Sequence, residues 1–167
     1  MTYVVEDREI FNRGLELFNK KMYREAATQL NYFLSLPSST SASDRSDALL
    51  VISQCTMDIN EARQWAYLAI KEAPDRRECF VRMAKLCCLA EEYDQSLKYA
   101  ELAFAITEKP AEYVSKDWAW DWQIYDIAAV SAWVHGDTNK AREYGAKALE
   151  MNPNHERLKK NVEYYLG

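Results

Sequence analysis

Apolar residues recur along the chain with the period of an amphipathic helix, most clearly between residues 78 and 106. Apolar residues occupy positions i, i+3, i+4 and i+7 there, and this spacing predicts a helix with one apolar face. These residues are Phe80, Met83, Ala84 and Cys87. After a polar break, a second face of the same period consists of Tyr93, Ser96, Leu97, Ala100, Ala103 and Phe104. Both helices carry further apolar residues outside these faces, so we expect the hairpin to need a neighbour on each side.

The same pattern predicts three more hairpins and a final single helix. The hairpins are expected at about residues 6–37, 44–74, 76–107 and 120–153, and the final helix at 155–166. The apolar side of that helix consists of Leu158, Val162 and Tyr165, whereas Arg157, Lys159, Lys160 and Glu163 are expected to face water. A one-sided helix of this kind ends a stacked array without an exposed apolar face. We therefore expect residues 1–167 to form one domain.

Acidic residues mark where several helices should begin. Asp58 followed by Glu61 resembles a capping box, in which the first side chain accepts a hydrogen bond from the backbone of the third residue on. Asp75 and Glu78 repeat this spacing. The second hairpin is expected to open at Asp44.

Small residues occupy equivalent positions in the second helix of each hairpin, namely Ala26, Ala62, Ser96 and Ala141. The step from Ala62 to Ser96 is 34 residues, and Gly14 would allow a close helix crossing in the first hairpin. Together with a proline after each unit, this pattern resembles the tetratricopeptide repeat, most clearly in AAVSAWVHGDTNKAREYGAKALEMNP at residues 128–153. The resemblance implies an all-α, right-handed solenoid of four helical hairpins plus a C-terminal capping helix.

An insertion rich in tryptophan separates the last two hairpins. From Ser96 to Ala141 the step is 45 residues, which is 11 more than the 34 of the preceding unit. The insertion holds Tyr113, Trp118, Trp120 and Trp122. We expect an ordered loop that enters the next helix by about Trp120, with Trp118 and Trp122 on one side of that helix and Trp120 on another.

Composition narrows the classes of function. Apolar residues make up 49% of the chain, and only four Gly and four Pro occur, which favours a helical core. The net charge of −5 offers no broad basic surface, so we expect no nucleic-acid partner and no membrane partner. No apolar run approaches the roughly 20 residues of a membrane span, and no signal-peptide pattern is visible at the start. The four cysteines lack CxxC spacing, so we expect reduced thiols in a cytoplasmic protein.

The sequence shows no Gly-rich phosphate loop, no HExxH and no nucleophile elbow. We therefore expect a non-catalytic chain with no cofactor and no metal. His135 and His155 are interpreted as capping or surface residues. Asp126, beside Tyr125 and Ile127 at a helix start, is expected to be partly buried and hydrogen-bonded; a functional role is the alternative.

In tetratricopeptide proteins the first helix of each unit lines a concave groove that binds partner segments. By that resemblance, the partner-binding candidates are Phe11, Leu15, Phe18, Asp47, Val51, Gln54, Glu78, Arg82, Lys85, Gln123, Asp126, Val130 and Trp133. The Lys/Asn/Arg clamp that some members use for a terminal carboxylate is not expected, because only Arg82 matches it. We interpret Arg82, Lys85 and Glu78 as a helix ion-pair group worth roughly 0.3–0.5 kcal/mol, with an anion contact as the alternative.

A narrower resemblance covers Pro74 to Tyr165. This tract is similar to the helical tail of bacterial and phage family 2 glycosyltransferases. The matching residues are Arg76, Arg77, Glu78, Tyr113, Trp120, Tyr125, Asp126, Asn152, Pro153, Glu156, Arg157, Leu158, Asn161 and Tyr164. No sugar-nucleotide domain or Asp-x-Asp motif precedes the repeats in this sequence. The resemblance thus implies either the accessory domain of a cytosolic glycosyltransferase or a stand-alone relative of such a domain, and we favour the first.

Two classes of function remain open. The first is a scaffold that binds a protein or peptide, joins a glycosyltransferase catalytic domain in cis, or self-associates as a homodimer. The second is a sugar or small-molecule site at the insertion, formed by Tyr113, Trp118, Trp120 and Trp122 with Asp126. We favour the first, because large aromatic residues mostly serve packing.

Overall fold

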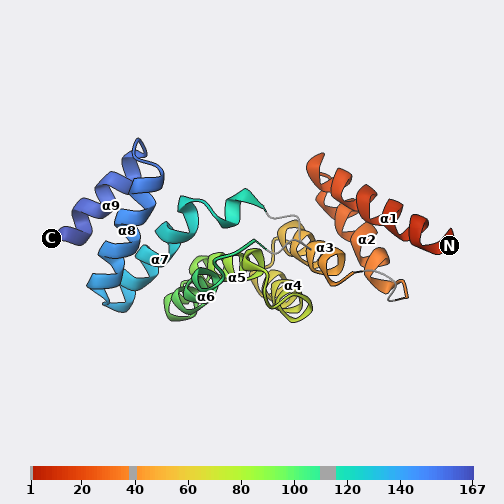
Figure 1. Ribbon diagram of the computed structural model, residues 1–167, viewed down its shortest axis with the longest axis horizontal. Coiled ribbons are helices and arrows are strands. Elements are labelled where there is room, and N and C mark those ends of the chain that lie inside the picture. The colour runs from red at the N-terminus through yellow and green to blue at the C-terminus, as the bar shows by residue number, and fades with distance from the viewer. Residues whose placement is uncertain (1, 38–40, 110–115) are drawn as a thin grey trace. The chain divides into compact units, whose positions relative to one another are not determined.

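The computed structural model describes residues 2–37, 41–109 and 116–167, with side chains from residue 7 onward (Figure 1). Within these ranges it contains nine α-helices, one 3₁₀-helix and no strand, which confirms the predicted all-α fold. The α-helices are α1 (Thr2–Asn19), α2 (Tyr23–Ser35), α3 (Ala42–Cys55), α4 (Ile59–Glu72), α5 (Arg77–Leu89), α6 (Tyr93–Ala105), α7 (Trp122–His135), α8 (Thr138–Met151) and α9 (Glu156–Leu166). The 3₁₀-helix η1 (Asp117–Ala119) lies between α6 and α7 in the sequence.

The chain divides into two compact units. The N-terminal unit, Met1–Asp75, holds α1 to α4, and the C-terminal unit, Arg76–Gly167, holds α5 to α9 with η1. In each unit a helix packs against the next one along the chain, and the first helices of successive hairpins also touch, as α1 with α3 and α5 with α7. This is the packing of stacked helical hairpins.

The core of the N-terminal unit forms where α1, α2 and α3 meet. Its buried members are Phe11, Leu30, Phe33, Ala48, Val51 and Ile52. The rings of Phe11 and Phe33 lie 5.1 Å apart. Gly14 makes the crossing of α1 and α2 possible, because a Cβ at that position would lie 2.6 Å from Cγ of Leu30. The close crossing expected at Gly14 is therefore present.

Two of the three predicted helix starts, those of α3 and α4, belong to the N-terminal unit. Asp58 caps α4 as predicted, and its side chain accepts a hydrogen bond of 2.8 Å from the backbone of Glu61. The expected start of α3 at Asp44 is wrong. Ser41 is the N-cap, and its hydroxyl accepts from the backbone N–H of Asp44 at 3.2 Å. A serine hydroxyl satisfies a free N–H of the first turn as well as a carboxylate does.

Small hydroxyl side chains join neighbouring helices in both units. In the N-terminal unit, Ser53 donates to the carbonyl of Ala62 at 2.8 Å. In the C-terminal unit, Ser96 donates to the carbonyl of Ala84 at 2.9 Å, and Ser131 donates to the Ser96 hydroxyl at 2.9 Å. All three serines are fully buried. Each contact pairs a small polar side chain with a group of a neighbouring helix in the buried interior.

The start of α5 departs from the prediction. Arg76, not Asp75, is the N-cap residue, and the Arg76 side chain makes no capping hydrogen bond. Glu78 is only 3% exposed, and its Oε1 accepts a hydrogen bond of 2.7 Å from the backbone N–H of Lys116. The carboxylate expected to complete a cap therefore holds the connection between α6 and α7.

Candidate interaction surfaces

The first-helix candidates of the N-terminal unit contribute mainly to its core. Phe11 is 3% exposed, and Leu15 and Phe18 are half-buried against the same cluster. Asp47 and Val51 are buried, and the amide of Gln54 is half-buried and donates to the carbonyl of Leu50 at 3.3 Å. Binding of a partner by these residues stays a prediction.

The candidates of the C-terminal unit vary more in exposure. Lys85 and Gln123 are exposed, whereas Arg82 and Val130 are half-buried. Trp133 packs against the rings of Tyr164 and Tyr165, at centroid distances of 4.9 and 5.3 Å. Here too, a role in partner binding stays a prediction.

Asp126 is buried and hydrogen-bonded, as expected, and it joins α7 to α9. Its Oδ1 and Oδ2 accept from Nη1 and Nη2 of Arg157 at 3.1 and 2.7 Å. Nδ2 of Asn161 donates to Oδ1 at 3.3 Å. The expectation that the charged end of Arg157 faces only water is thus wrong. The guanidinium fork matches the carboxylate geometry, and this fixes the final helix on its neighbour.

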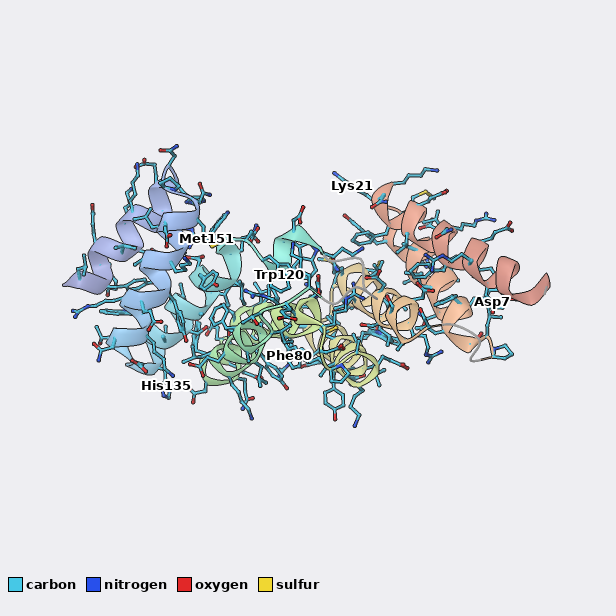
Figure 2. All side chains as sticks on the ribbon, in the orientation of Figure 1. Asp7, Lys21, Phe80, Trp120, His135 and Met151 are labelled. Atoms are coloured by element: carbon cyan, nitrogen blue, oxygen red, sulfur yellow. The ribbon has the colours of Figure 1, made fainter. Side chains whose placement is uncertain are left out.

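The described part of the insertion is ordered around Arg77. This guanidinium donates to the carbonyl of Ala119 at 2.9 Å and to that of Ile106 at 3.3 Å. The guanidinium carbon of Arg77 also lies 4.3 Å from the ring centre of Trp120 (Figure 2). Nζ of Lys109 lies 5.3 Å from the centre of the same ring. Two cations therefore already contact the indole ring of Trp120.

The expected entry into a helix by Trp120 is wrong. Trp118 belongs to η1, and α7 begins only at Trp122, so the three tryptophans do not share one helix. Asp121 is the N-cap of α7, and its carboxylate accepts from the backbone of Gln123 at 2.8 Å. Trp122 packs on His155, with ring centres 4.7 Å apart. Tyr113, the fourth aromatic residue of the predicted sugar site, lies outside the described residues.

A pocket that the sequence did not predict lies among α6, α7 and α8. Its volume is about 800 Å³, and it is lined by Phe104, Tyr125, Glu143, Tyr144, Ala146, Lys147 and Glu150. We call it the aromatic pocket. Phe104 stacks on Tyr125 at a centroid distance of 4.6 Å and lies 5.2 Å from the tilted ring of Tyr144. The rings come from three helices, so no local pattern in the sequence brings them together.

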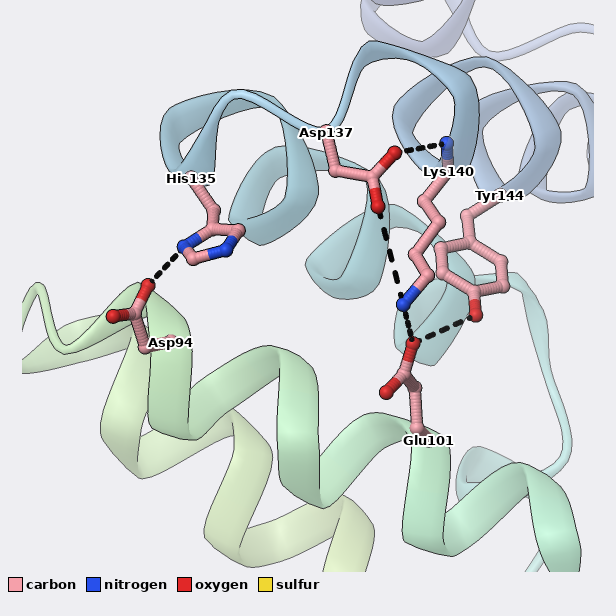
Figure 3. A network of polar contacts seen from close by, with 6 residues as sticks. All are labelled: Asp94, Glu101, His135, Asp137, Lys140 and Tyr144. Carbon is pink, nitrogen blue, oxygen red and sulfur yellow. Dashed lines mark hydrogen bonds and ion pairs between the residues drawn. The ribbon is translucent and has the colours of Figure 1, made fainter.

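Charged side chains surround the aromatic pocket. Glu101 accepts from Nζ of Lys140 at 2.6 Å and from the hydroxyl of Tyr144 at 3.4 Å (Figure 3). Lys147 and Glu150 pair at 2.9 Å. Burial, followed by the negative charge of Glu101, raises the pKa of Tyr144 to about 12, so its hydroxyl stays neutral at physiological pH.

A smaller hollow lies at the turn between α5 and α6. It has a volume of about 430 Å³, and its lining includes Tyr93, Asp94, Val134 and His135. Nδ1 of His135 lies 2.5 Å from the carboxylate of Asp94 (Figure 3). His135 is exposed, in keeping with the surface role expected for it. Among the described residues, no group of His, Cys, Asp and Glu side chains is arranged to hold a metal ion.

No helix in the described ranges has the length and apolar character needed to cross a membrane. No protein-family model matches the sequence, and no curated protein matches it. Solved structures do resemble it. The structure of PilF from Pseudomonas aeruginosa is 16% identical with a TM-score of 0.73, and the match covers 96% of this chain and 65% of that one. The chain thus spans slightly less than two thirds of PilF.

Structures of MamA are also similar. MamA residues 41-end from Desulfovibrio magneticus RS-1 are 13% identical with a TM-score of 0.75, and the match covers 95% of this chain and 82% of that one. Another MamA crystal structure is 14% identical with a TM-score of 0.74, covering 95% and 80%. PilF and MamA are tetratricopeptide-like proteins, so the comparisons confirm the tetratricopeptide-type fold predicted from the repeat period.

Proposed function

We propose that this chain is a non-catalytic scaffold that binds a segment of a partner protein. The observation that carries the proposal is the aromatic pocket, where the rings of Phe104, Tyr125 and Tyr144 line an open hollow of about 800 Å³. Aromatic side chains supply much of the binding energy at protein interfaces, because they bury a large area for little lost conformational entropy. Stacked helical hairpins present such surfaces on rigid elements.

The resemblance to glycosyltransferase tails suggests one source of the partner, namely a catalytic domain in cis. Several residues of that resemblance have packing roles here. Arg77 and Glu78 hold the connection between α6 and α7, and Asp126 with Arg157 joins α7 to α9. The residues that carry the resemblance therefore have a structural role, because they stabilise the packing of the helices. A catalytic domain in cis, or a second copy of the chain, is then the partner to be sought.

A photo-crosslinking residue placed at Ala146 tests the proposal, because this exposed alanine lines the aromatic pocket. The matched position is Gln123, an exposed residue of the predicted first-helix surface. We expect a defined crosslinked partner from position 146, whose purified form then binds the wild-type chain and binds Tyr144→Ala more weakly. Crosslinking only from position 123 would instead assign binding to the first helices. No specific product from either position would contradict the scaffold.

The rival function, a sugar site at the tryptophans, requires an open indole face. Trp120 lacks one on the side of Arg77, whose guanidinium lies 4.3 Å from its ring centre. Titration with nucleotide sugars and oligosaccharides, followed by tryptophan fluorescence, separates the two functions. We expect no saturable change. A saturable change that disappears in Trp120→Phe would favour the rival.

A further inference from the structure

The charges around the aromatic pocket favour a positively charged group. Three carboxylates lie at or beside it, on Glu101, Glu143 and Glu150, together with the cations of Lys140, Lys147 and Arg77, the last over the ring of Phe104. Each lysine is already held by a glutamate, Lys140 by Glu101 and Lys147 by Glu150. Glu143 is exposed, and within the described part of the chain it shows no ion pair. Glu143 is therefore the exposed carboxylate of the lining that a further cation can pair with, although it also interacts electrostatically with Lys140.

The hydroxyl of Tyr144 lies in the electrostatic field of two of these carboxylates. After burial, the carboxylates of Glu101 and Glu143 are the largest causes that raise its pKa, although Lys140 lies beside Glu101. The part of this shift that comes from the carboxylates reflects a negative potential that also favours a cation, whereas burial disfavours either charge.

The aromatic lining suits a cation as well. The faces of Tyr and Phe rings carry negative potential and attract guanidinium and ammonium groups within about 6 Å. The C-terminal unit already uses this contact internally, because the guanidinium carbon of Arg77 lies 5.7 Å from the ring centre of Phe104 and 4.3 Å from that of Trp120. Arginine fits better than lysine, since its planar group stacks on a ring while its N–H groups reach a carboxylate.

We propose that the aromatic pocket binds an arginine side chain of the partner segment, stacked against the tyrosine rings and paired with Glu143. This inference rests on the proposed function, and it names the chemistry of the partner at the contact. A hydrophobic or acidic segment is the competing occupant.

The first test selects peptides from a random displayed library against the full chain. The strongest peptide is then synthesised in two forms, with arginine and with citrulline, which keeps the shape and removes the charge. Fluorescence anisotropy measures the affinity of both for the wild type and for Glu143→Gln, Lys147→Gln and Glu163→Gln. Glu163 is an exposed glutamate of α9 outside the pocket lining, so its substitution is the matched control.

We expect arginine-containing peptides, weaker binding of the citrulline form, and a loss of roughly two- to five-fold in Glu143→Gln, the range of an exposed ion pair. Lys147→Gln should instead strengthen binding, because it removes a positive charge and releases Glu150. Misfolding cannot produce such a gain. Glu163→Gln should bind as the wild type does.

The outcomes separate the two proposals. Peptides that bind at the pocket without arginine, or equal affinity for the citrulline form, would overturn the arginine contact and leave the scaffold standing. Weaker binding in Lys147→Gln would also contradict it. If no peptide is enriched at all, the scaffold function fails together with the inference.

Discussion

Buried charged residues of the C-terminal unit lie close to groups that complement them. Asp126 is 8% exposed and receives N–H groups from Arg157 and Asn161 of α9. Burying a carboxylate is unfavourable unless such donors replace its water. The same contacts therefore both stabilise the carboxylate and decide where the final helix lies.

Asp126→Asn should lower the free energy of unfolding by about 1–3 kcal/mol, since the charge-assisted hydrogen bonds from Arg157 weaken while its guanidinium can still reach water. Urea unfolding of the full chain measures this loss. Glu156→Gln is the control, because its ion pair with Lys159 is exposed and such pairs contribute little. Equal stability of Asp126→Asn and the wild type would show that the contact between Asp126 and Arg157 does not stabilise the chain.

Tyr165 should make stability fall at high pH. Burial, followed by the charge of Asp126, raises the pKa of its hydroxyl to about 12 from an ordinary value near 10. Below pH about 10 the hydroxyl keeps its proton in both the folded and the unfolded chain, so the contribution of Tyr165 to stability is fully present. This contribution is lost as the pH rises from about 10 to about 12, because in that range the hydroxyl ionises in the unfolded chain only. Tyr165→Phe should reduce this fall by at most about 2–3 kcal/mol. Urea unfolding at stepped pH, with phenolate absorbance, measures it, and an identical pH profile in the variant would contradict it.

At the scale of elements, one arginine organises the connection between α6 and α7. Arg77 is 5% exposed, and it bonds the carbonyls of Ile106, just after α6, and Ala119, in η1. It therefore joins the start of α5 to both ends of the described connection.

Arg77→Met keeps the apolar stem but removes both donors. We expect a loss of about 2–3 kcal/mol, because two carbonyls lose their partner in a buried place. Hydrogen exchange should rise in residues 116–121, more than in α8. Lys85→Gln, an exposed change on the same helix, is the control and should alter neither quantity. Unchanged exchange in Arg77→Met would mean that the connection is held by other contacts.

Helix crossing in the N-terminal unit depends on Gly14. Alanine has a helix propensity about 1 kcal/mol better than that of glycine, yet overpacking costs about 1–3 kcal/mol. A Cβ here would lie 2.6 Å from Cγ of the fully buried Leu30, so we expect Gly14→Ala to destabilise the chain. Adding Leu30→Val should recover part of the loss, and Asn12→Ala, exposed on the same helix, should not destabilise it. Thermal unfolding measures all three, and a stabilised Gly14→Ala would contradict the close crossing.

At the scale of the whole molecule, the chain consists of two compact units, each with its own interior. The contacts that hold α9, η1 and the α5–α6 crossing, the last through Ser96 and the carbonyl of Ala84, all lie within Arg76–Gly167. We expect the isolated fragment 76–167 to fold alone. Circular dichroism should show that the fragment is helical and unfolds cooperatively in urea. A broad transition without a folded baseline would contradict independent folding of the fragment, and it would favour the single domain expected from the sequence.

Much of the fold followed from periodicity alone. The cap at Asp58 and the close crossing at Gly14 were visible in the sequence, because each depends on residues a few positions apart or on a single small side chain. The burial of Asp126 was expected from its apolar neighbours in the sequence, but its partners were not. The cap at Asp75 was wrong for a different reason. Glu78 has the right spacing for a capping box, but a backbone N–H at Lys116 takes its carboxylate instead.

The sequence by itself determined the all-α class, the order of the hairpins and the small residues at their crossings, since helices are selected by local periodicity. Only the tertiary structure decided that Arg77 bonds Ala119, that Arg157 bonds Asp126, and that Phe104, Tyr125 and Tyr144 line one pocket. These partners are 31 or more residues apart, or lie on different helices. Their meeting depends on how an irregular connection folds and which rotamers fit, and no periodic pattern encodes either.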